Sequence, residues 1–199
     1  MGAILQSLGR TISAGVVLLV VLIAIAGGFG SGVTMDQAWW AFFMRWLHVI
    51  SGVMWIGLLW YFNFVQMPSM PKIPDEQKPA IGKVIAPTAL FWFRWAALST
   101  VVTGLLLATL LGYIGRALTL QDGVRAIGIG MWLALIMAFN VWFIIWPNQK
   151  KALGIVQVAP EEKTKAARLA MLASRFNTML SVPMLWMMVI QQNRGGAVF

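Results

Sequence analysis

The sequence predicts an all-α protein, an integral membrane helical bundle of about five transmembrane helices that forms one domain over residues 1–199. The first observation is composition: 60% of the residues are hydrophobic and 11% are charged, whereas a soluble domain needs a larger polar shell. The second is the length of the apolar stretches, close to the roughly 20 residues that cross a bilayer as a helix. The third is that these stretches lack the alternation of a membrane β-barrel.

Five apolar stretches are predicted to span the membrane. They cover residues 12–30, 39–65, 88–113, 126–146 and 171–190. The first follows Arg10 and is interpreted as a retained anchor, not as a cleaved signal peptide. The charged stretch 161–168 precedes the fifth span and is predicted to be a helix at the membrane interface.

Prolines set the predicted ends of two helices. Prolines at positions 68, 71, 74 and 79 are expected to end the second span, because proline lacks an amide hydrogen and its ring collides with the preceding turn. Pro147 is expected to end the fourth span for the same reason. The fifth span is interrupted by Arg175, Asn177 and Pro183.

Lysine and arginine are unevenly distributed between the two sides of the predicted bundle. Nine lie on one side: Arg10, Lys72, Lys78, Lys83, Lys150, Lys151, Lys163, Lys165 and Arg168. The other side has Arg116, Arg125 and Arg194. Because cytoplasmic loops carry the excess of basic residues, the N-terminus is predicted in the cytoplasm and the C-terminus on the far side.

Charge and cysteine content exclude several classes of function. The net charge of +9 comes from short basic runs between apolar stretches, which is typical of loops that face anionic lipid, so no nucleic-acid partner is expected. The absence of cysteine excludes iron–sulfur clusters and covalently attached c-type haem in this sequence. All six acidic residues lie outside the predicted spans, and no phosphate-binding glycine loop or nucleophile elbow is present, which argues against an ATPase or hydrolase.

His48, the only histidine, lies about nine residues inside the second predicted span. At about 1.5 Å per residue it is about 13 Å below the interface, a depth at which ionisable side chains face the bundle interior and mark functional sites. The imidazole is therefore a candidate haem ligand, or a structural histidine that hydrogen-bonds a carbonyl of a neighbouring helix. Helical spacing places five residues on the same face: Arg45, Gly52, Trp55, Leu59 and Asn63.

Three arginines near span ends are candidate contacts for an anion. Arg45, Arg94 and Arg175 could each pair with a haem propionate or another anionic group. Each could equally extend its long side chain toward lipid phosphate.

The 13 methionines suggest a copper site as a further possibility, because thioethers bind Cu(I). Three of them lie on the fifth span: Met184, Met187 and Met188. Filling of irregular gaps in the core is the more common role of this side chain, and it is the favoured interpretation here.

Small and hydroxylated side chains indicate a close contact between the second and third spans. Gly52 and Gly57 lie on the second, and Thr100, Thr103 and Gly104 lie on the third. Such residues let membrane helices approach closely, so these two faces are predicted to pack together.

The segment RWLHVISGVMWIG at residues 45–57, continued by YFNFVQ at 61–66, resembles the N-terminal membrane domain of the bacterial membrane-bound urate oxidases, also called urate hydroxylases. This resemblance extends loosely over residues 39–190. The tryptophan–histidine part of the segment is also similar to the small membrane protoporphyrinogen oxidases, in which the corresponding histidine is taken to bind haem b.

These resemblances imply a haem-b-binding redox protein or subunit of the bacterial inner membrane. His48 would be the axial ligand of the haem iron, and Arg45 and Arg94 would contact the cofactor. The related urate oxidases are longer and end in a c-type cytochrome domain, whereas this sequence has no Cys-x-x-Cys-His motif, so a separate cytochrome c would accept the electrons. With one histidine, the second axial ligand would be a methionine, a histidine of a partner subunit, water or none.

The alternative is a non-catalytic accessory subunit that scaffolds a larger membrane complex and uses its polar residues for helix packing. In both cases the expected partners are membrane lipids and other membrane subunits or further copies of this chain. Whether the chain is itself an enzyme, and on which substrate, stays open at the level of sequence.

Overall fold

The structure, a computed structural model, describes residues 2–26 and 34–194, and within these ranges it is helical throughout, without a strand. The predicted all-α class is therefore confirmed. Four helices of the described part are long and apolar enough to cross a membrane: Leu8–Ile25, Gln37–Lys72, Lys78–Leu110 and Arg125–Ala152. They fit a membrane protein, while the number of spans stays a prediction.

The first 40 residues form a unit of their own. This unit contains the short helix α1 (Gly2–Leu5) and the helix α2 (Leu8–Ile25). No residue of α2 is buried, as expected for an apolar helix whose surroundings are lipid. The predicted first span ended at residue 30, and its last four positions lie outside the described residues.

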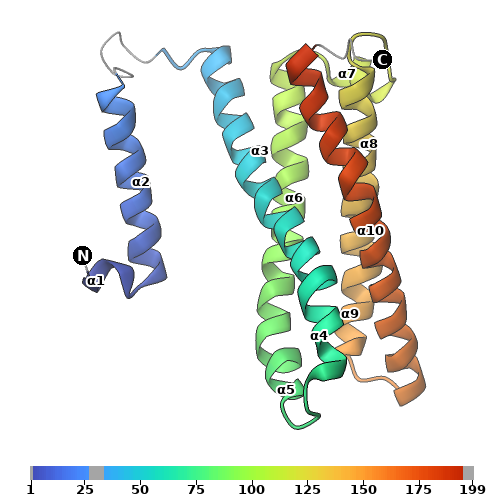
Figure 1. Ribbon diagram of the computed structural model, residues 1–199. Helices are drawn as coiled ribbons and strands as arrows, with labels where there is room; N and C mark the ends of the chain where they lie inside the picture. The colour runs from blue at the N-terminus through green and yellow to red at the C-terminus, as the bar shows by residue number, and fades with distance from the viewer. Residues whose placement is uncertain (1, 27–33, 195–199) are drawn as a thin grey trace. The chain divides into compact units, whose positions relative to one another are not determined.

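The second unit, residues 41–199, is built from two pairs of long helices (Figure 1). The first pair begins with α3 (Gln37–Trp60), η1 (Tyr61–Gln66), α4 (Met67–Ser69) and η2 (Met70–Lys72). The chain returns through α5 (Lys78–Ala80), η3 (Ile81–Ile85) and α6 (Ala86–Leu110). After the short α7 (Ile114–Leu118), the second pair consists of α8 (Arg125–Phe139), η4 (Asn140–Ile145), α9 (Trp146–Ala152) and the 35-residue α10 (Pro160–Arg194).

Several prolines lie inside long helices that do not end at them, among them Pro68, Pro87 and Pro147. The predicted helix ends at Pro68 and Pro147 are wrong: the second long helix runs to Lys72 and the fourth to Ala152. A π-helical segment lies just before each of these three, since η1 ends before Pro68, η3 before Pro87 and η4 before Pro147. A wider turn moves the carbonyl that the proline ring would strike, so the helix continues.

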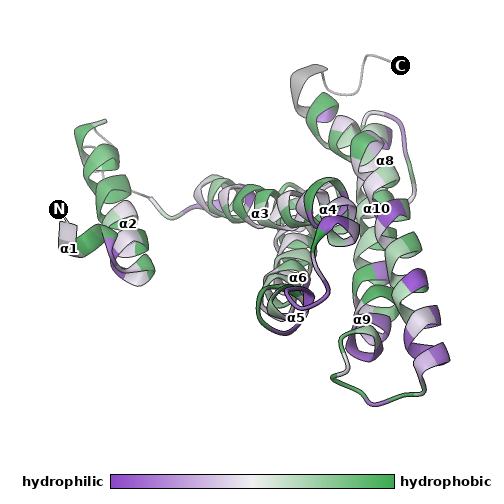
Figure 2. Cartoon of the chain, turned by 60° about the horizontal axis from the view of Figure 1, so that its bottom comes forward, coloured by the Kyte–Doolittle hydropathy of each residue, from purple (hydrophilic) through white to green (hydrophobic). Residues whose placement is uncertain are grey.

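The fifth predicted span forms part of α10, which also includes the charged stretch 161–168 as its first turns. This helix is not among the four that are apolar enough to qualify as spans. Hydrophilic residues are concentrated at its start and near α4 and α9 (Figure 2). At about 1.5 Å per residue, α10 is about 50 Å long, which exceeds the roughly 30 Å hydrocarbon thickness.

The core of the bundle lies between α3, α6, α8 and α10. Trp55, Leu59, Phe93 and Met137 are almost completely buried there, and the rings of Phe62 and Phe93 pack edge to face at 5.7 Å. Edge-to-face pairs suit the charge distribution of aromatic rings.

Polar contacts connect α10 to η1 of the first helix pair and to η4 of the helix beside it. In η1, the amide of Asn63 donates to the Ser174 hydroxyl at 2.8 Å. In η4, the amide of Asn140 donates to the Asn177 side-chain oxygen at 2.8 Å, and Asn177 donates to the Met137 carbonyl at 2.9 Å. Asn177 is fully buried, so a polar residue that interrupted the predicted span is a bridge between helices.

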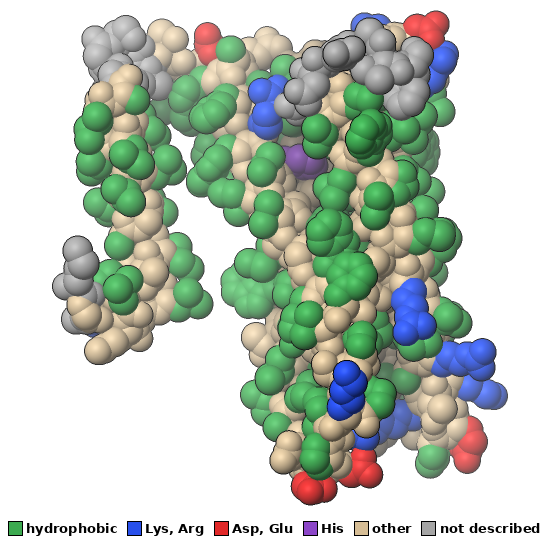
Figure 3. Space-filling view, viewed as in Figure 1, with side chains coloured by type: hydrophobic (Ala, Val, Ile, Leu, Met, Phe, Trp, Pro, Cys, Tyr) green, Lys and Arg blue, Asp and Glu red, His purple; other side chains and the backbone are tan. Residues whose placement is uncertain are grey.

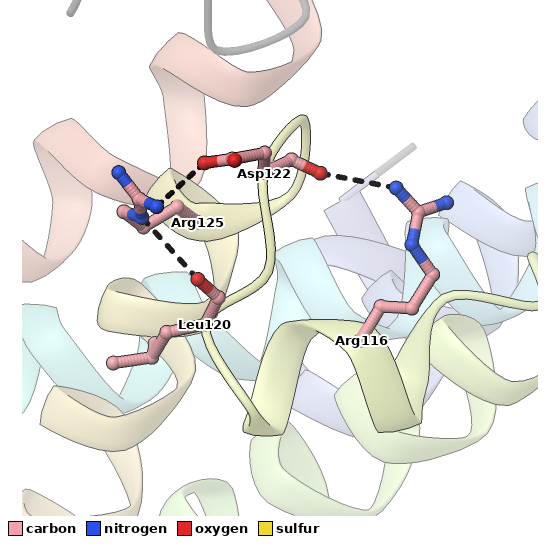
Figure 4. Close-up of polar contacts among 4 residues, drawn as sticks. All are labelled: Arg116, Leu120, Asp122 and Arg125. Carbon is pink, nitrogen blue, oxygen red and sulfur yellow. Dashed lines mark hydrogen bonds and ion pairs between the residues drawn. The ribbon is translucent and has the colours of Figure 1, made fainter.

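A compact loop joins α7 to α8 at the other end of the bundle (Figure 4). Arg125 binds the Asp122 carboxylate at 2.5 Å and the Leu120 carbonyl at 3.2 Å, and Arg116 donates to the Asp122 carbonyl at 3.0 Å. Gly128 lets α7 lie directly on α8, because a Cβ there would come within 2.1 Å of the Ala117 carbonyl oxygen. These contacts fix the segment that follows α6, which carries Tyr113.

Candidate functional site

A cavity of about 770 Å³ lies between α3, α6, α8 and α10 in the half of the bundle that contains His48. Its wall is mostly apolar, with valine, leucine, isoleucine and methionine side chains from all four helices. The charged or titratable residues on it are Arg45, His48 and Tyr113. The histidine is visible in a recess of the surface, coloured purple in Figure 3.

His48 is held by a neighbouring helix through one ring nitrogen. Its Nδ1 lies 2.8 Å from the carbonyl oxygen of Thr100 on α6, so Nδ1 carries the proton and donates it. The other nitrogen, Nε2, is then left with its lone pair. No residue of the described part hydrogen-bonds Nε2, and His48 lines the cavity. The Thr100 contact is the one expected of a structural histidine, and it is also the contact that fixes the tautomer of metal-binding histidines.

Gly104 makes room for the imidazole. A Cβ at this position would lie 2.8 Å from His48 Cε1 and 2.9 Å from Nδ1, closer than side chains approach one another. The Thr103 hydroxyl, which donates to the Ser99 carbonyl at 2.6 Å, is also near the ring, 3.5 Å from Nδ1. The imidazole therefore has one position, set by α6.

The second and third long helices meet at the predicted faces, through side-chain contacts and not through a close approach of their backbones. Thr100, Thr103 and Gly104 face His48, and the hydroxyls of Ser51 and Ser99 bond at 2.9 Å. A Cβ on Gly52 would make an ordinary contact of 3.9 Å with Thr100. Gly57 differs from the prediction: it faces open space and lines the cavity.

Arg45 and Tyr113 lie at the same cavity, from different elements. Arg45 precedes His48 by three residues on α3, and its Nε is buried without a hydrogen-bond partner. Tyr113 follows α6 and is half-buried. The phenol of a tyrosine is protonated at neutral pH and can donate a hydrogen bond.

The structure does not bring Arg94 to His48. Arg94 lies on α6 outside the cavity wall, is 9% exposed, and stacks its guanidinium 3.3 Å from the centre of the Trp146 ring. Its Nε and Nη1 have no hydrogen-bond partner, so the interaction with Trp146 is a cation–π contact in a largely buried environment. Arg175 is exposed on α10.

Three methionines contribute to the cavity wall: Met131 from α8, and Met184 and Met188 from α10. Met131 and Met184 are buried in the core. Met187 and Met188 pack against α8, where a Cβ on Gly130 would meet Met187 Cβ at 3.2 Å. Packing is thus the evident role of these side chains, and the cavity places three thioethers in the same wall as the imidazole.

Tyr113 was missed by sequence reasoning. It is one of only two tyrosines and is the last residue of the predicted third span, 88–113, at the end of the bundle that Arg45 also occupies. These two facts were available from the sequence, but the contact between the segment after α6 and the start of α3 depends on how the helices tilt.

Comparison with known families gives one match. The sequence model of the family described as "Urate oxidase N-terminal" matches residues 119–193, which cover α8, η4, α9 and nearly all of α10. This part of the chain, which is less than half of it, is similar to that family. No curated protein and no solved structure matches the chain.

Proposed function

We propose that this chain belongs to the urate oxidase N-terminal family and is a multi-pass membrane protein that binds haem b through His48 and serves as a redox protein or subunit. The family match supports the first part of this proposal, and it lies on the two helices opposite His48 in the bundle. The haem part is supported by the cavity.

The observation that carries the proposal is an imidazole on the wall of a large apolar cavity, with one of its ring nitrogens already hydrogen-bonded to the protein. The Thr100 carbonyl accepts the Nδ1 hydrogen at 2.8 Å, and this arrangement gives Nε2 the lone pair that ligates iron. The volume of about 770 Å³ lies within the roughly 300–1,000 Å³ of cofactor sites. The apolar wall suits the face of a porphyrin, so the residues present fit the group.

Bound haem would supply one-electron chemistry at the iron. His48 would hold the iron from α3, and the Thr100 carbonyl and Gly104 would fix the ring plane of the imidazole. Met131, Met184 and Met188 line the same cavity and could also hold the group, and a methionine ligand would raise its reduction potential. A cytochrome c is the proposed electron acceptor, and no cysteine of these 199 residues could hold its haem.

The second candidate function is the accessory subunit without a cofactor. It is favoured by the polar contacts between helices, of which the bond from Trp60 Nε1 to the Ser181 hydroxyl at 3.0 Å is typical. In that case the His48–Thr100 bond would be one more such contact, and the cavity would hold lipid chains.

Visible absorption of the purified protein tests the proposal. Wild-type protein expressed with ample haem is expected to show a Soret band, and His48→Ala is expected to lose it while the protein stays folded in the membrane. His48→Met is expected to shift the band, because a thioether still ligates iron.

Leu47→Ala is the matched control, because Leu47 is next to His48 but not on the cavity wall. It is expected to keep the wild-type spectrum. A wild-type protein without absorbance beyond its aromatic residues would exclude haem and leave the accessory subunit.

A further inference from the structure

We infer that Arg45 and Tyr113 form a carboxylate-binding pair at one end of the cavity, so that the ligand is an apolar ring system with acid groups on one edge. This inference rests on the proposed function and adds the orientation and the chemical class of the ligand. It assigns a ligand-binding role to Tyr113.

The position of Arg45 relative to His48 gives the orientation of the ligand in the cavity. Residues three apart on a helix share a face, and their separation along the axis is about 4.5 Å. A flat ligand ligated by His48 Nε2 therefore has one edge next to the Arg45 side chain. His48 is deeper in the bundle, so this edge is the one nearer the end where α7 lies (Figure 1).

The hydrogen-bonding state of Arg45 shows that a partner is missing. Its Nε is buried and makes no hydrogen bond. The ion pairs found among the described residues use Asp75, Asp122 and Glu162, and none of them involves Arg45. Arg45 is half-buried, and a partly desolvated guanidinium without an anion carries an energetic cost, so a ligand that brings a carboxylate offsets part of this cost.

Tyr113 supplies a second donor to the same place. Its phenol makes no hydrogen bond with a described residue, and it lines the same cavity as Arg45. An ionised carboxylate is an acceptor with two oxygens, and bonds from a guanidinium and a phenol to a carboxylate are of the strong, charge-assisted kind. The pair therefore selects an anion over a neutral or cationic group.

The rest of the cavity wall determines which kind of molecule can carry the carboxylate. Beyond this end the cavity is lined by residues such as Ile56, Leu107 and Met184, which offer no hydrogen bonds to a polar body. A ligand that fits both parts is an apolar macrocycle with propionates on one edge, and protoporphyrin has this form.

The test compares haem b with its dimethyl ester, in which both propionates are esterified, as ligands of the full-length protein in detergent. The measured quantity is the ratio of the two dissociation constants. Wild-type protein is expected to prefer haem b, and Arg45→Gln and Tyr113→Phe are each expected to reduce this preference. The reduction for Arg45→Gln should be about tenfold or more, as for loss of a charge-assisted hydrogen bond.

Two matched variants serve as controls. Tyr61→Phe removes the other tyrosine, and Arg168→Gln removes an exposed arginine near the start of α10; neither residue is on the cavity wall. Both should keep the wild-type ratio. Equal binding of haem b and its ester by wild-type protein, or variants with an unchanged ratio, would overturn the carboxylate pair alone. Binding of neither porphyrin would overturn the proposed function and this inference with it.

Discussion

At the scale of single residues, the position of His48 depends on the absence of a side chain across from it. Gly104 faces the ring on α6, and the Thr100 carbonyl one turn before it accepts the Nδ1 hydrogen. The space and the hydrogen bond come from the same stretch of helix, so a change in either alters the direction of Nε2.

Gly104→Ala is expected to displace the imidazole. The added Cβ would lie within 3 Å of two ring atoms, and the ring cannot move away without weakening its bond to Thr100. The variant should therefore have a weaker or shifted Soret band, and a net destabilisation of about 1–3 kcal/mol from overpacking. Absorption spectra and thermal unfolding in detergent measure both effects.

Gly57→Ala is the control for that substitution. Gly57 lies on the same cavity but a Cβ there meets nothing within 4 Å. Alanine is favoured over glycine inside a helix by about 1 kcal/mol, so this variant should keep the spectrum and gain stability. A Gly104→Ala protein that behaved like Gly57→Ala would show that His48 is not confined as described.

At the scale of elements, the π-helical segments explain how α8 and α9 form one helix with a proline inside. The wide turn of η4 begins at Asn140, whose side chain reaches Asn177 on α10. The π-helical turn thus provides a polar contact between helices. A change in the turn would alter the Asn140–Asn177 contact, and a change in the contact would alter the turn.

The Asn140–Asn177 contact is expected to behave as a coupled pair. Asn140→Leu and Asn177→Leu should each lower the free energy of unfolding by about 0.5–2 kcal/mol, because each leaves a buried amide without its partner. The double variant should cost less than the sum of the two single changes. Chemical unfolding in mild detergent gives the three values, and strictly additive costs would show that the two amides do not interact.

The sequence predicted the helices well and their ends poorly. Length and apolarity are properties of a whole stretch, so residues 39–65 and 126–146 were located correctly. The ends at Pro68 and Pro147 were wrong because a proline ends a regular α-helix, and the sequence does not show that the turn before it widens. Asn177 looked like an interruption for a similar reason, since its partner is 37 residues away.

The site could be predicted only in part. Arg45 and His48 are three positions apart on one helix, and this spacing alone predicts that they share a face. Tyr113 and the cavity itself depend on the packing of four helices, and the separation of Arg94 from the cavity follows from the direction in which α6 presents that side chain to Trp146.

At the scale of the whole bundle, charge is concentrated at one end. Lys72, Lys78, Lys151 and Lys163 belong to the ends of long helices that lie together near α4, α5 and α9 (Figures 1 and 3). Arg116 and Arg125 lie at the opposite end, in the loop between α7 and α8. This distribution is the one that the predicted orientation requires.

Topology is tested with alkaline phosphatase fusions, since this enzyme is active only outside the cytoplasm. A fusion after Phe199 is expected to be active and a fusion after Lys151 inactive, because the basic end is predicted to face the cytoplasm. A fusion of a cytoplasmic reporter such as green fluorescent protein at the same two sites should give the opposite pattern. Activity of the phosphatase after Lys151 would contradict the orientation and the five-span arrangement.

The cavity wall includes Val49 and Val53 of α3 and Val189 of α10, which are more than half exposed, so the cavity is not closed off on the side of these two helices. In the proposed membrane arrangement these side chains face acyl chains, so the cavity opens sideways into the bilayer. A ligand would then arrive by lateral diffusion from the lipid phase, and the concentration that sets occupancy is its partitioned concentration there. An apolar body is enriched in that phase many-fold over water, so a modest intrinsic affinity is sufficient to keep the site filled.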